Sequence, residues 1–143
     1  MICLCFSIDD VNYAFRQELI VELVPHMELC PVAGAPTYIP GCFNYRGRVT
    51  PVVDLAMLLR DRASVRVLST RIAVVRYGAS RLLGLLMENA TETQDFEDEP
   101  QSSGVLCEKS FMEGVLLDSE RTVQLVGIEG LLPPDVLALL YKD

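Results

Sequence analysis

Hydrophobic positions along the chain alternate with polar ones or form short apolar runs, a pattern typical of β-strands rather than helices. Turn-forming residues separate these runs at intervals of about 8–12 residues, which indicates an all-β sandwich or barrel rather than a parallel sheet with crossover helices. The predicted strands are 2–8, 12–15, 19–24, 41–45, 49–55, 70–77, 82–87, 112–117 and 122–128.

Only two short helices interrupt this pattern. Asp54 precedes a run of good helix formers at 55–60, where its carboxylate can cap the helix. Pro133 and Pro134 begin the second helix, which ends near Tyr141, because proline is tolerated in the first helical turn. The polar, acidic segment 93–104 is predicted to be a long loop.

The two halves of the chain resemble each other weakly. Residues 52–59 align with 125–132, and residues 7–15 align with 77–85, which places Glu22 on Glu92. Such a repeat predicts that one strand order is used twice, in two small barrels of residues 1–65 and 66–143. An exchange of strands between the barrels stays open, and chance similarity between apolar strands is the alternative to a repeat.

Composition limits the partners that the chain can have. Half of its 143 residues are hydrophobic and 22% are charged, which excludes a disordered chain and predicts a stable core. The net charge of −8 argues against nucleic-acid binding, which needs clustered Lys and Arg. No segment reaches the ~18 apolar residues of a membrane helix, and no basic stretch opens a signal peptide. The acidic run at 92–99 is expected to be solvated.

Residues that could support catalysis are scarce. The five cysteines are odd in number and form no Cys-x-x-Cys pair, so a reducing cytoplasm is expected rather than disulfides or a zinc site. His26 is the single histidine, and nucleotide-binding glycine motifs are absent from the sequence. We therefore predict no catalytic, cofactor or metal site. The alternative is a small cysteine-dependent enzyme, in which one of the five cysteines would have to meet His26; Cys30 is near it in the sequence.

The segment 41–55 has features that core packing does not demand. Arg46 and Arg48 flank Gly47, which can supply the positive φ that a tight hairpin turn requires. Asn44 and Tyr45 stand beside them, and arginine and tyrosine are frequent anchors of protein interfaces. On composition alone, an ordinary polar hairpin tip is the favoured explanation of the segment.

The segment Tyr38-Ile-Pro-Gly-Cys-Phe-Asn-Tyr-Arg-Gly-Arg-Val-Thr-Pro-Val-Val-Asp-Leu55 resembles the signature of the CheW family. Every fixed position of that signature is matched, and Tyr45 occupies a place that is usually aliphatic. Segments 5–15, 83–88 and 114–132 resemble other strands of the family. The resemblance therefore covers almost the whole chain.

This resemblance implies a single CheW-like domain over residues 1–143, built as two SH3-like, five-stranded β-barrels with short helices. It also implies a cytoplasmic adaptor without enzymatic activity, cofactor or small-molecule substrate. CheW-like proteins link the cytoplasmic tip of methyl-accepting chemoreceptors to the regulatory domain of a CheA-type histidine kinase, and are thereby recruited to membrane-bound receptor complexes. A regulatory barrel derived from such a kinase is a further alternative.

The same resemblance implies a receptor-binding site. In the family, an acidic residue of an early strand pairs with the arginine of the signature, and these positions correspond to Glu22 and Arg46. Such a pair would hold the arginine in place, and partial burial would strengthen it. The other residues expected in the receptor-facing groove are Ile20, Gly41, Phe43, Asn44, Tyr45 and Gly47.

Four short segments point to one branch of the family. Residues 43–47, 68–72, 88–92 and 131–134 are similar to CheW-like proteins of Wsp-type pathways. Those pathways couple a receptor and a kinase to cyclic-di-GMP output, surface sensing and biofilm formation rather than to the flagellar switch.

Overall fold

Strands are the main secondary structure of the protein, seen in a computed structural model that describes residues 1–90, 92–101, 111–118 and 120–141. In chain order the elements are β1 (Ile2–Ile8), β2 (Val11–Arg16), a 3₁₀ turn (Gln17–Leu19), β3 (Ile20–Pro25), β4 (Gly41–Tyr45), β5 (Arg48–Asp54), α1 (Leu55–Arg60), β6 (Arg71–Tyr77), β7 (Arg81–Met87), β8 (Glu92–Asp95), β9 (Met112–Leu117), β10 (Thr122–Val126) and α2 (Pro134–Leu140).

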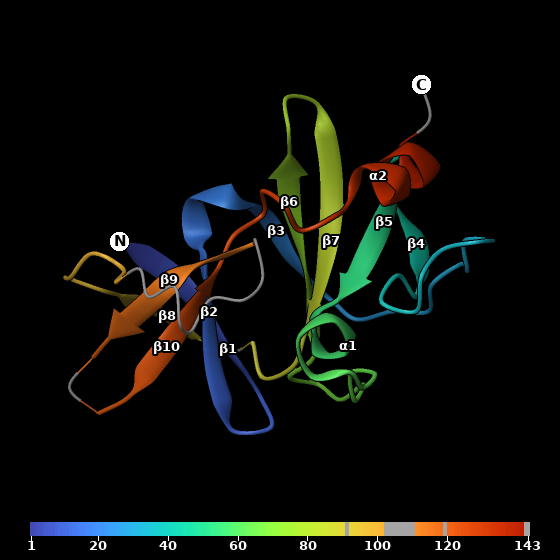
Figure 1. The fold of residues 1–143 in the computed structure, drawn as a ribbon. Helices are drawn as coiled ribbons and strands as arrows, with labels where there is room; N and C mark the ends of the chain where they lie inside the picture. Colours follow the sequence, from blue (N-terminus) through green and yellow to red (C-terminus); the bar gives the residue numbers. More distant parts are fainter. Residues whose placement is uncertain (91, 102–110, 119, 142–143) are drawn as a thin grey trace. The chain divides into compact units, whose positions relative to one another are not determined.

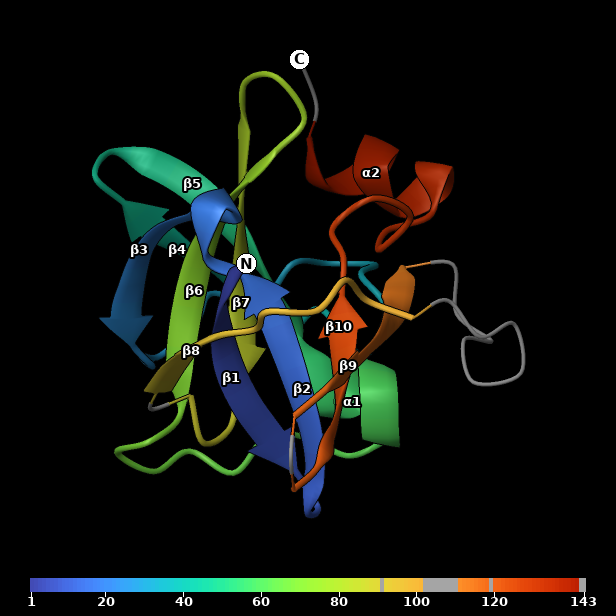
Figure 2. The same ribbon diagram turned by 90° about the vertical axis from the view of Figure 1, so that its left-hand side faces the viewer.

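The strands form two five-stranded sheets. The first has the order β8-β1-β2-β10-β9, which can be followed from left to right in Figure 2. The second has the order β3-β6-β7-β5-β4, visible in Figure 1. Each sheet joins two antiparallel hairpins through one parallel pair, β2 with β10 in the first sheet and β5 with β7 in the second. The predicted all-β fold of two five-stranded barrels is confirmed.

The two sheets also follow one plan, as the internal repeat predicts. In each half of the chain the strands come in the same order, a hairpin, a single strand and a second hairpin. The single strands β3 and β8, which contain Glu22 and Glu92, both lie at the edge of a sheet. This shared order favours a true repeat over chance similarity.

The chain divides into units that differ from the predicted halves 1–65 and 66–143. One compact unit consists of Met1–Glu18 and Asn89–Leu132, and the other of Leu19–Glu88 and Pro133–Asp143. The opening hairpin pairs with strands from the second half of the chain, and β6 and β7 pair with strands from the first. The approximate boundary at 65 assigns each barrel only neighbouring segments, whereas the sheets exchange hairpins, which is the alternative that the sequence leaves open.

The segment predicted as a solvated acidic loop begins with a strand instead. β8 pairs antiparallel with β1, so that Glu92 lies opposite Cys5 and Asp95 opposite Ile2. Its side chains stay largely outside the core, which is why its composition carries no apolar strand pattern. Polar and charged residues suit an edge strand because they discourage pairing with another chain.

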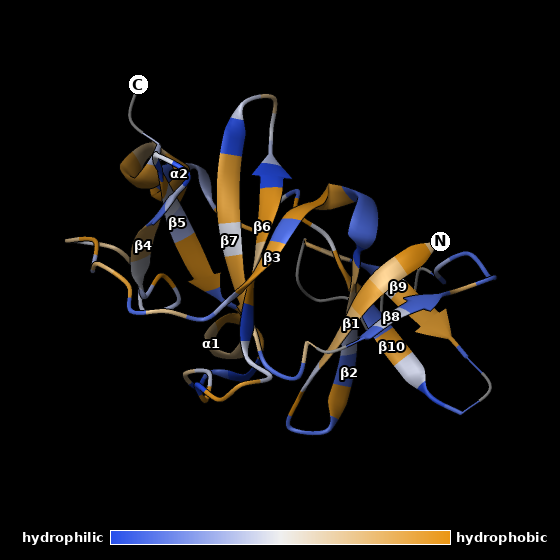
Figure 3. Ribbon diagram, turned by 180° about the vertical axis from the view of Figure 1, so that it is seen from behind, coloured by the Kyte–Doolittle hydropathy of each residue, from blue (hydrophilic) through white to orange (hydrophobic). Residues whose placement is uncertain are grey.

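Each unit has its own apolar core. The first contains Cys3, Cys5, Ala14, Phe96, Leu116, Val123 and Leu125. The second contains Phe43, Tyr45, Val52, Ile72, Val74 and Leu86. In Figure 3 most strands are hydrophobic along much of their length, whereas β8 and many of the turns are polar, as expected for sheets that bury one face and expose their turns. Full burial of one such aliphatic side chain stabilises the fold by about 1.5–3 kcal/mol.

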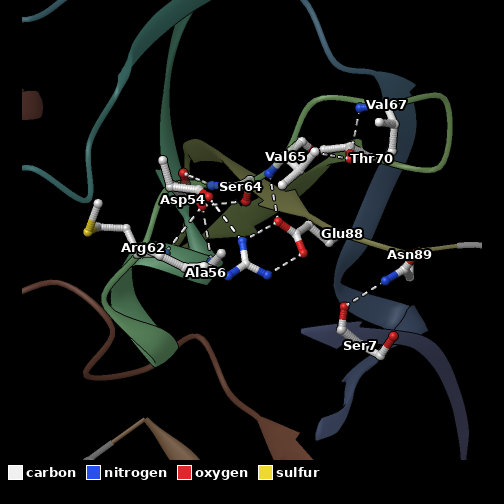
Figure 4. Close-up of polar contacts among 12 residues, drawn as sticks. Ser7, Asp54, Ala56, Arg62, Ser64, Val65, Val67, Thr70, Glu88 and Asn89 are labelled. Carbon is white, nitrogen blue, oxygen red and sulfur yellow. Dashed lines mark hydrogen bonds and ion pairs between the residues drawn. The ribbon is translucent and has the colours of Figure 1, made fainter. Parts of the chain in front are cut away.

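Polar groups anchor the loop that follows α1. As predicted, the Asp54 carboxylate caps this helix by accepting hydrogen bonds from the Ala56 and Met57 amides, at 3.0 and 3.4 Å. The same carboxylate accepts a hydrogen bond from the Ser64 amide at 2.9 Å (Figure 4). Asp54 is 4% exposed, so this aspartate of the signature is a structural residue.

An ion pair lies beside this cap. The Arg62 guanidinium donates hydrogen bonds to both carboxylate oxygens of Glu88, at 2.6 and 2.7 Å (Figure 4). The Val65 amide donates a further hydrogen bond to Glu88 at 2.7 Å. Glu88 is buried and the Arg62 side chain is 32% exposed. The pair therefore holds the loop against the end of β7.

Within the described ranges, no helix has the length and apolarity needed to cross a membrane. The same residues include no group of three or more His, Cys, Asp or Glu side chains arranged to hold a metal ion.

Candidate functional site

The candidate site is centred on the tight turn between β4 and β5. Arg46 and Gly47 have φ values of 50° and 86°, so both central residues are left-handed, as in a type I′ hairpin turn. The Asn44 side-chain oxygen accepts a hydrogen bond from the Gly47 amide at 2.7 Å and fixes the turn. The predicted turn at Gly47 is confirmed, although Arg48 already belongs to β5.

Glu22 and Arg46 form the predicted pair. The Arg46 guanidinium donates to the Glu22 carboxylate at 2.8 Å, and the Tyr45 hydroxyl donates to the same oxygen at 2.6 Å. Glu22 comes from β3 and Tyr45 from β4, the two edges of the second sheet. These contacts therefore bridge the sheet's first and last strands, which approach each other when a sheet curls into a barrel.

The hydrogen bonds of this cluster shift the acid–base behaviour of its members. The hydrogen bond from Tyr45, together with the Arg46 guanidinium, lowers the pKa of Glu22. Donation to a carboxylate raises the pKa of the Tyr45 hydroxyl. Because the pKa of Glu22 is lowered, the pair is fully formed above the ordinary Glu value of about 4.3 and is lost as pH falls through the lowered pKa.

Exposure indicates that the pair orients a surface group. The Arg46 side chain is 75% exposed and that of Glu22 is 38% exposed. Exposed ion pairs contribute little to the stability of a fold. The pair lacks the burial that would strengthen it, so we expect it to add little to the free energy of unfolding. The guanidinium carbon also lies 5.5 Å from the centre of the Tyr45 ring. Arg46 is thus held at the surface by contacts with a carboxylate and an aromatic ring.

The other predicted site residues divide between surface and interior. Asn44 and Gly47 are exposed in the turn, and Ile20 is half-buried at the start of β3, next to an irregularity in its pairing with β6. Phe43 is 8% exposed and belongs to the core of its unit, and Gly41 is buried. These last two support the hairpin from within and do not contribute to its exposed surface.

Gly41 is required by a close backbone approach, so a Gly41→Ala variant should be less stable. A Cβ atom there would lie 2.5 Å from the Cys30 carbonyl oxygen, a backbone atom that also pairs with the Cys42 amide. We expect the free energy of unfolding to fall by about 2 kcal/mol, measured by urea denaturation.

A Gly47→Ala variant is the matched control for Gly41→Ala, because its Cβ would meet nothing within 4 Å and its cost comes only from a positive φ. The Gly41 variant should be the less stable of the two. The opposite order would contradict the assigned close approach.

The cysteines give no support to the cysteine-enzyme hypothesis. Cys3 and Cys5 are buried, and burial raises the pKa of both thiols. Burial also raises the pKa of the half-buried Cys42. Cys107 lies outside the residues that the structure describes. Among the described residues, no hydrogen bond joins His26 to Cys30. An activated thiol would instead have a lowered pKa.

Thiol labelling tests this distribution. At pH 7, with the native protein, we expect a maleimide to modify Cys30 readily and Cys42 more slowly, and to reach Cys3 and Cys5 only after unfolding. Peptide mapping by mass spectrometry identifies the labelled positions. A thiol in the native protein that reacts faster than free cysteine would revive the enzyme hypothesis.

Sequence reasoning missed the neighbours of this hairpin. The Arg48 guanidinium donates a hydrogen bond at 2.6 Å to the Ser80 carbonyl oxygen, in the turn between β6 and β7. Arg76 and Arg81 flank that turn. The sequence positions of these three arginines do not indicate that they lie close together, because only the parallel pairing of β5 with β7 brings the two hairpin tips together.

Comparisons with known proteins agree with the fold and with the signature. The model of the CheW-like domain family matches residues 3–135. The chemotaxis protein CheW of Rhizobium meliloti is 26% identical over 137 residues, which cover 92% of this chain and 87% of that protein. The chemotaxis protein CheW of Thermotoga maritima is 30% identical over 104 residues, which cover 67% of this chain and 69% of that protein.

One solved structure is similar over nearly its full length. The crystal structure of the scaffolding protein TtCheW from Thermoanaerobacter tengcongensis superimposes with a TM-score of 0.82, covering 94% of this chain and 89% of that one. The sequence identity is 20%, so this likeness supports the fold alone.

Proposed function

The chain belongs to the CheW-like domain family, and from this premise we propose that it is a non-catalytic adaptor of a chemotaxis-like signalling pathway. It couples the cytoplasmic tip of methyl-accepting chemoreceptors to the regulatory domain of a CheA-type histidine kinase. The observation that carries this proposal is the family match over residues 3–135, which leaves little of the chain for another activity. Two relatives that match more than 90% of this chain, over 80–87% of their own length, are named as chemotaxis proteins.

The proposed receptor-binding surface is the exposed part of the hairpin between β4 and β5 together with Glu22. Arg46 is its central residue, because the guanidinium is oriented by Glu22 and Tyr45 while remaining 75% exposed. Exposed arginine anchors of this kind contribute much of the binding energy of protein interfaces, whereas Tyr45, which is 9% exposed, supports Arg46 from the core of its unit. Asn44, Gly47 and Ile20 border the surface.

The experiment that tests the adaptor function measures both partners separately. Isothermal titration of the purified protein is carried out with a fragment of the receptor signalling tip and with the isolated regulatory domain of the kinase. We expect saturable binding to each. Absence of binding to both partners would refute the adaptor function. A failure to detect enzymatic activity would not count as support for it.

We further propose that the pathway is of the Wsp type and acts at the membrane-bound receptor complex in the cytoplasm. The support is the similarity of four short segments, at residues 43–47, 68–72, 88–92 and 131–134, to adaptors of such pathways. Deletion of the gene should lower cyclic-di-GMP and biofilm formation on surfaces and leave swimming chemotaxis intact. Loss of swimming chemotaxis with unchanged cyclic-di-GMP would assign the protein to flagellar control.

A further inference from the structure

Four arginine side chains surround one pocket at the end of the second sheet. The pocket, hereafter the arginine pocket, has a volume of about 420 Å³. The residues that line it are Val21, Tyr45, Arg46, Arg48, Arg76, Ala79, Ser80, Arg81 and Leu82. No Asp or Glu is found among these lining residues. A third of the chain's 12 basic residues thus gather here, in a protein with 20 acidic ones.

Strand pairing brings these arginines together. Arg81 begins β7 and Arg48 begins β5, and the two strands run parallel as neighbours in the sheet. Arg76 lies opposite Leu82 in the antiparallel pair of β6 and β7. In Figure 3 the ends of β6 and β7 beside their common turn are polar, in contrast to the apolar middle of each strand.

At least three of the guanidinium groups are held in fixed positions. Arg46 is bound by Glu22, and Arg48 donates to the Ser80 carbonyl oxygen at 2.6 Å. The Arg81 guanidinium lies 5.0 Å from the centre of the Tyr141 ring, and the Tyr141 hydroxyl donates to the Leu82 carbonyl oxygen at 2.7 Å. A ligand that meets such positioned donors loses less entropy on binding than one that must order them.

We propose that the arginine pocket binds an acidic segment of a partner protein, through two or more carboxylates. The planar guanidinium group donates two parallel hydrogen bonds to one carboxylate, a match that lysine cannot offer. The pocket also offers apolar surface from Val21, which is 42% exposed, and from Tyr45 and Leu82. This mixture suits a polypeptide better than a free anion.

A long polyanion fits the surface less well. Nucleic acids require a basic stripe that follows many phosphates, whereas these charges are confined to two hairpin tips. The net charge of −8 would repel such a polymer beyond the pocket. A short acidic segment places its charge only where the arginines are.

This inference deepens the proposed function and rests on it, because it gives the chemistry of the partner segment beside the receptor-binding surface. Arg46 belongs to both surfaces. Arg48, Arg76 and Arg81 extend the contact from the hairpin of β4 and β5 to that of β6 and β7. These three therefore separate the inference from the proposed role of the Glu22–Arg46 pair.

The test compares charge reversals inside the arginine pocket with one outside it. Arg48→Glu and Arg76→Glu alter the pocket, and Arg71→Glu, at the opposite end of β6, is the control. Binding of the receptor-tip fragment and of the kinase regulatory domain is measured at several salt concentrations. We expect each pocket variant to weaken binding of at least one partner about tenfold or more and to reduce the salt dependence, while Arg71→Glu binds as wild type.

The outcomes are distinguishable. If wild type binds a partner and neither pocket variant weakens it more than the Arg71 control, the pocket inference is overturned and the adaptor function stands. If wild type binds neither partner, both fail. Arg48→Gln and Arg76→Gln replace any reversal that does not fold, as judged by circular dichroism. A titration with inorganic phosphate is followed by the amide chemical shifts of the two hairpin tips. If phosphate saturates the pocket without displacing the partner, the pocket is a small-anion site and the inference is overturned.

Discussion

A Glu22→Lys variant is expected to fold as wild type and to bind the receptor-tip fragment at least about tenfold more weakly. The substitution removes the carboxylate that accepts hydrogen bonds from Tyr45 and Arg46. It also places a positive charge beside the Arg46 guanidinium, which turns an attraction into a repulsion. Arg46 would then no longer be held in the position proposed for receptor binding.

Two variants separate the charge from the geometry in this experiment. Arg46→Ala removes the guanidinium itself and should weaken receptor binding to a similar extent. Tyr45→Phe removes only the hydroxyl that donates to Glu22, so a smaller loss is expected, accompanied by a rise in the pKa of Glu22. Melting temperatures should stay near that of wild type, because the pair is mostly exposed. Wild-type affinity in both Glu22→Lys and Arg46→Ala would contradict the assigned surface.

An Arg62→Ala variant is expected to lose about 3 kcal/mol of unfolding free energy, the largest effect on stability that we predict. Removal of the guanidinium takes two hydrogen bonds and the ion pair from the buried Glu88 carboxylate, to which the Val65 amide still donates (Figure 4). A buried carboxylate without its ion-pair partner is costly because it has lost the solvation of water. Denaturation by urea with unchanged slope measures the loss.

A double-mutant cycle tests the assignment of this loss to the ion pair. Glu88→Gln keeps the size of the side chain and an acceptor for the Val65 amide but removes the charge. The double variant should lose less stability than the sum of the two single variants, because the unpaired buried charge is absent from it. Arg71→Ala, at an exposed arginine of the same unit, is the control and should be near wild type. Additive losses would show that Arg62 acts through packing rather than through Glu88.

Local chemistry explains why most elements could be predicted from the sequence. The apolar runs gave nearly all strands, Asp54 gave the helix cap, and Gly47 gave the turn, because each depends on residues that are close in the chain. β8 could not be predicted in this way, because it does not depend on residues close in the chain. Its residues are polar, and what makes it a strand is the backbone of β1 alongside it, which no pattern within 92–95 reveals.

Long-range pairing accounts for the other differences. The units exchange hairpins, so a boundary at residue 65 could not describe them, and the repeat alone does not say which hairpins pair. The Glu22–Arg46 pair joins residues 24 apart and came only from the family resemblance. Arg62 and Glu88 carried no signal at all, since their spacing of 26 residues fits no local motif.

The signature also has a clearer meaning in the structure than in the sequence. Gly41 permits the approach of the Cys30 backbone, Asn44 fixes the turn, and Asp54 caps α1 and holds Ser64. These positions maintain the fold. Arg46 differs from them because it is exposed and oriented, which is the property expected of a binding residue.

The most direct measurement of the central claim is receptor control of kinase activity in a reconstituted system. Autophosphorylation of the kinase is followed with membrane-bound receptor, in the presence and absence of this protein and of its Glu22→Lys variant. We expect the receptor to change the kinase rate only when the wild-type protein is present, and the variant to fail to couple them. An equal rate with and without the protein would contradict the adaptor function.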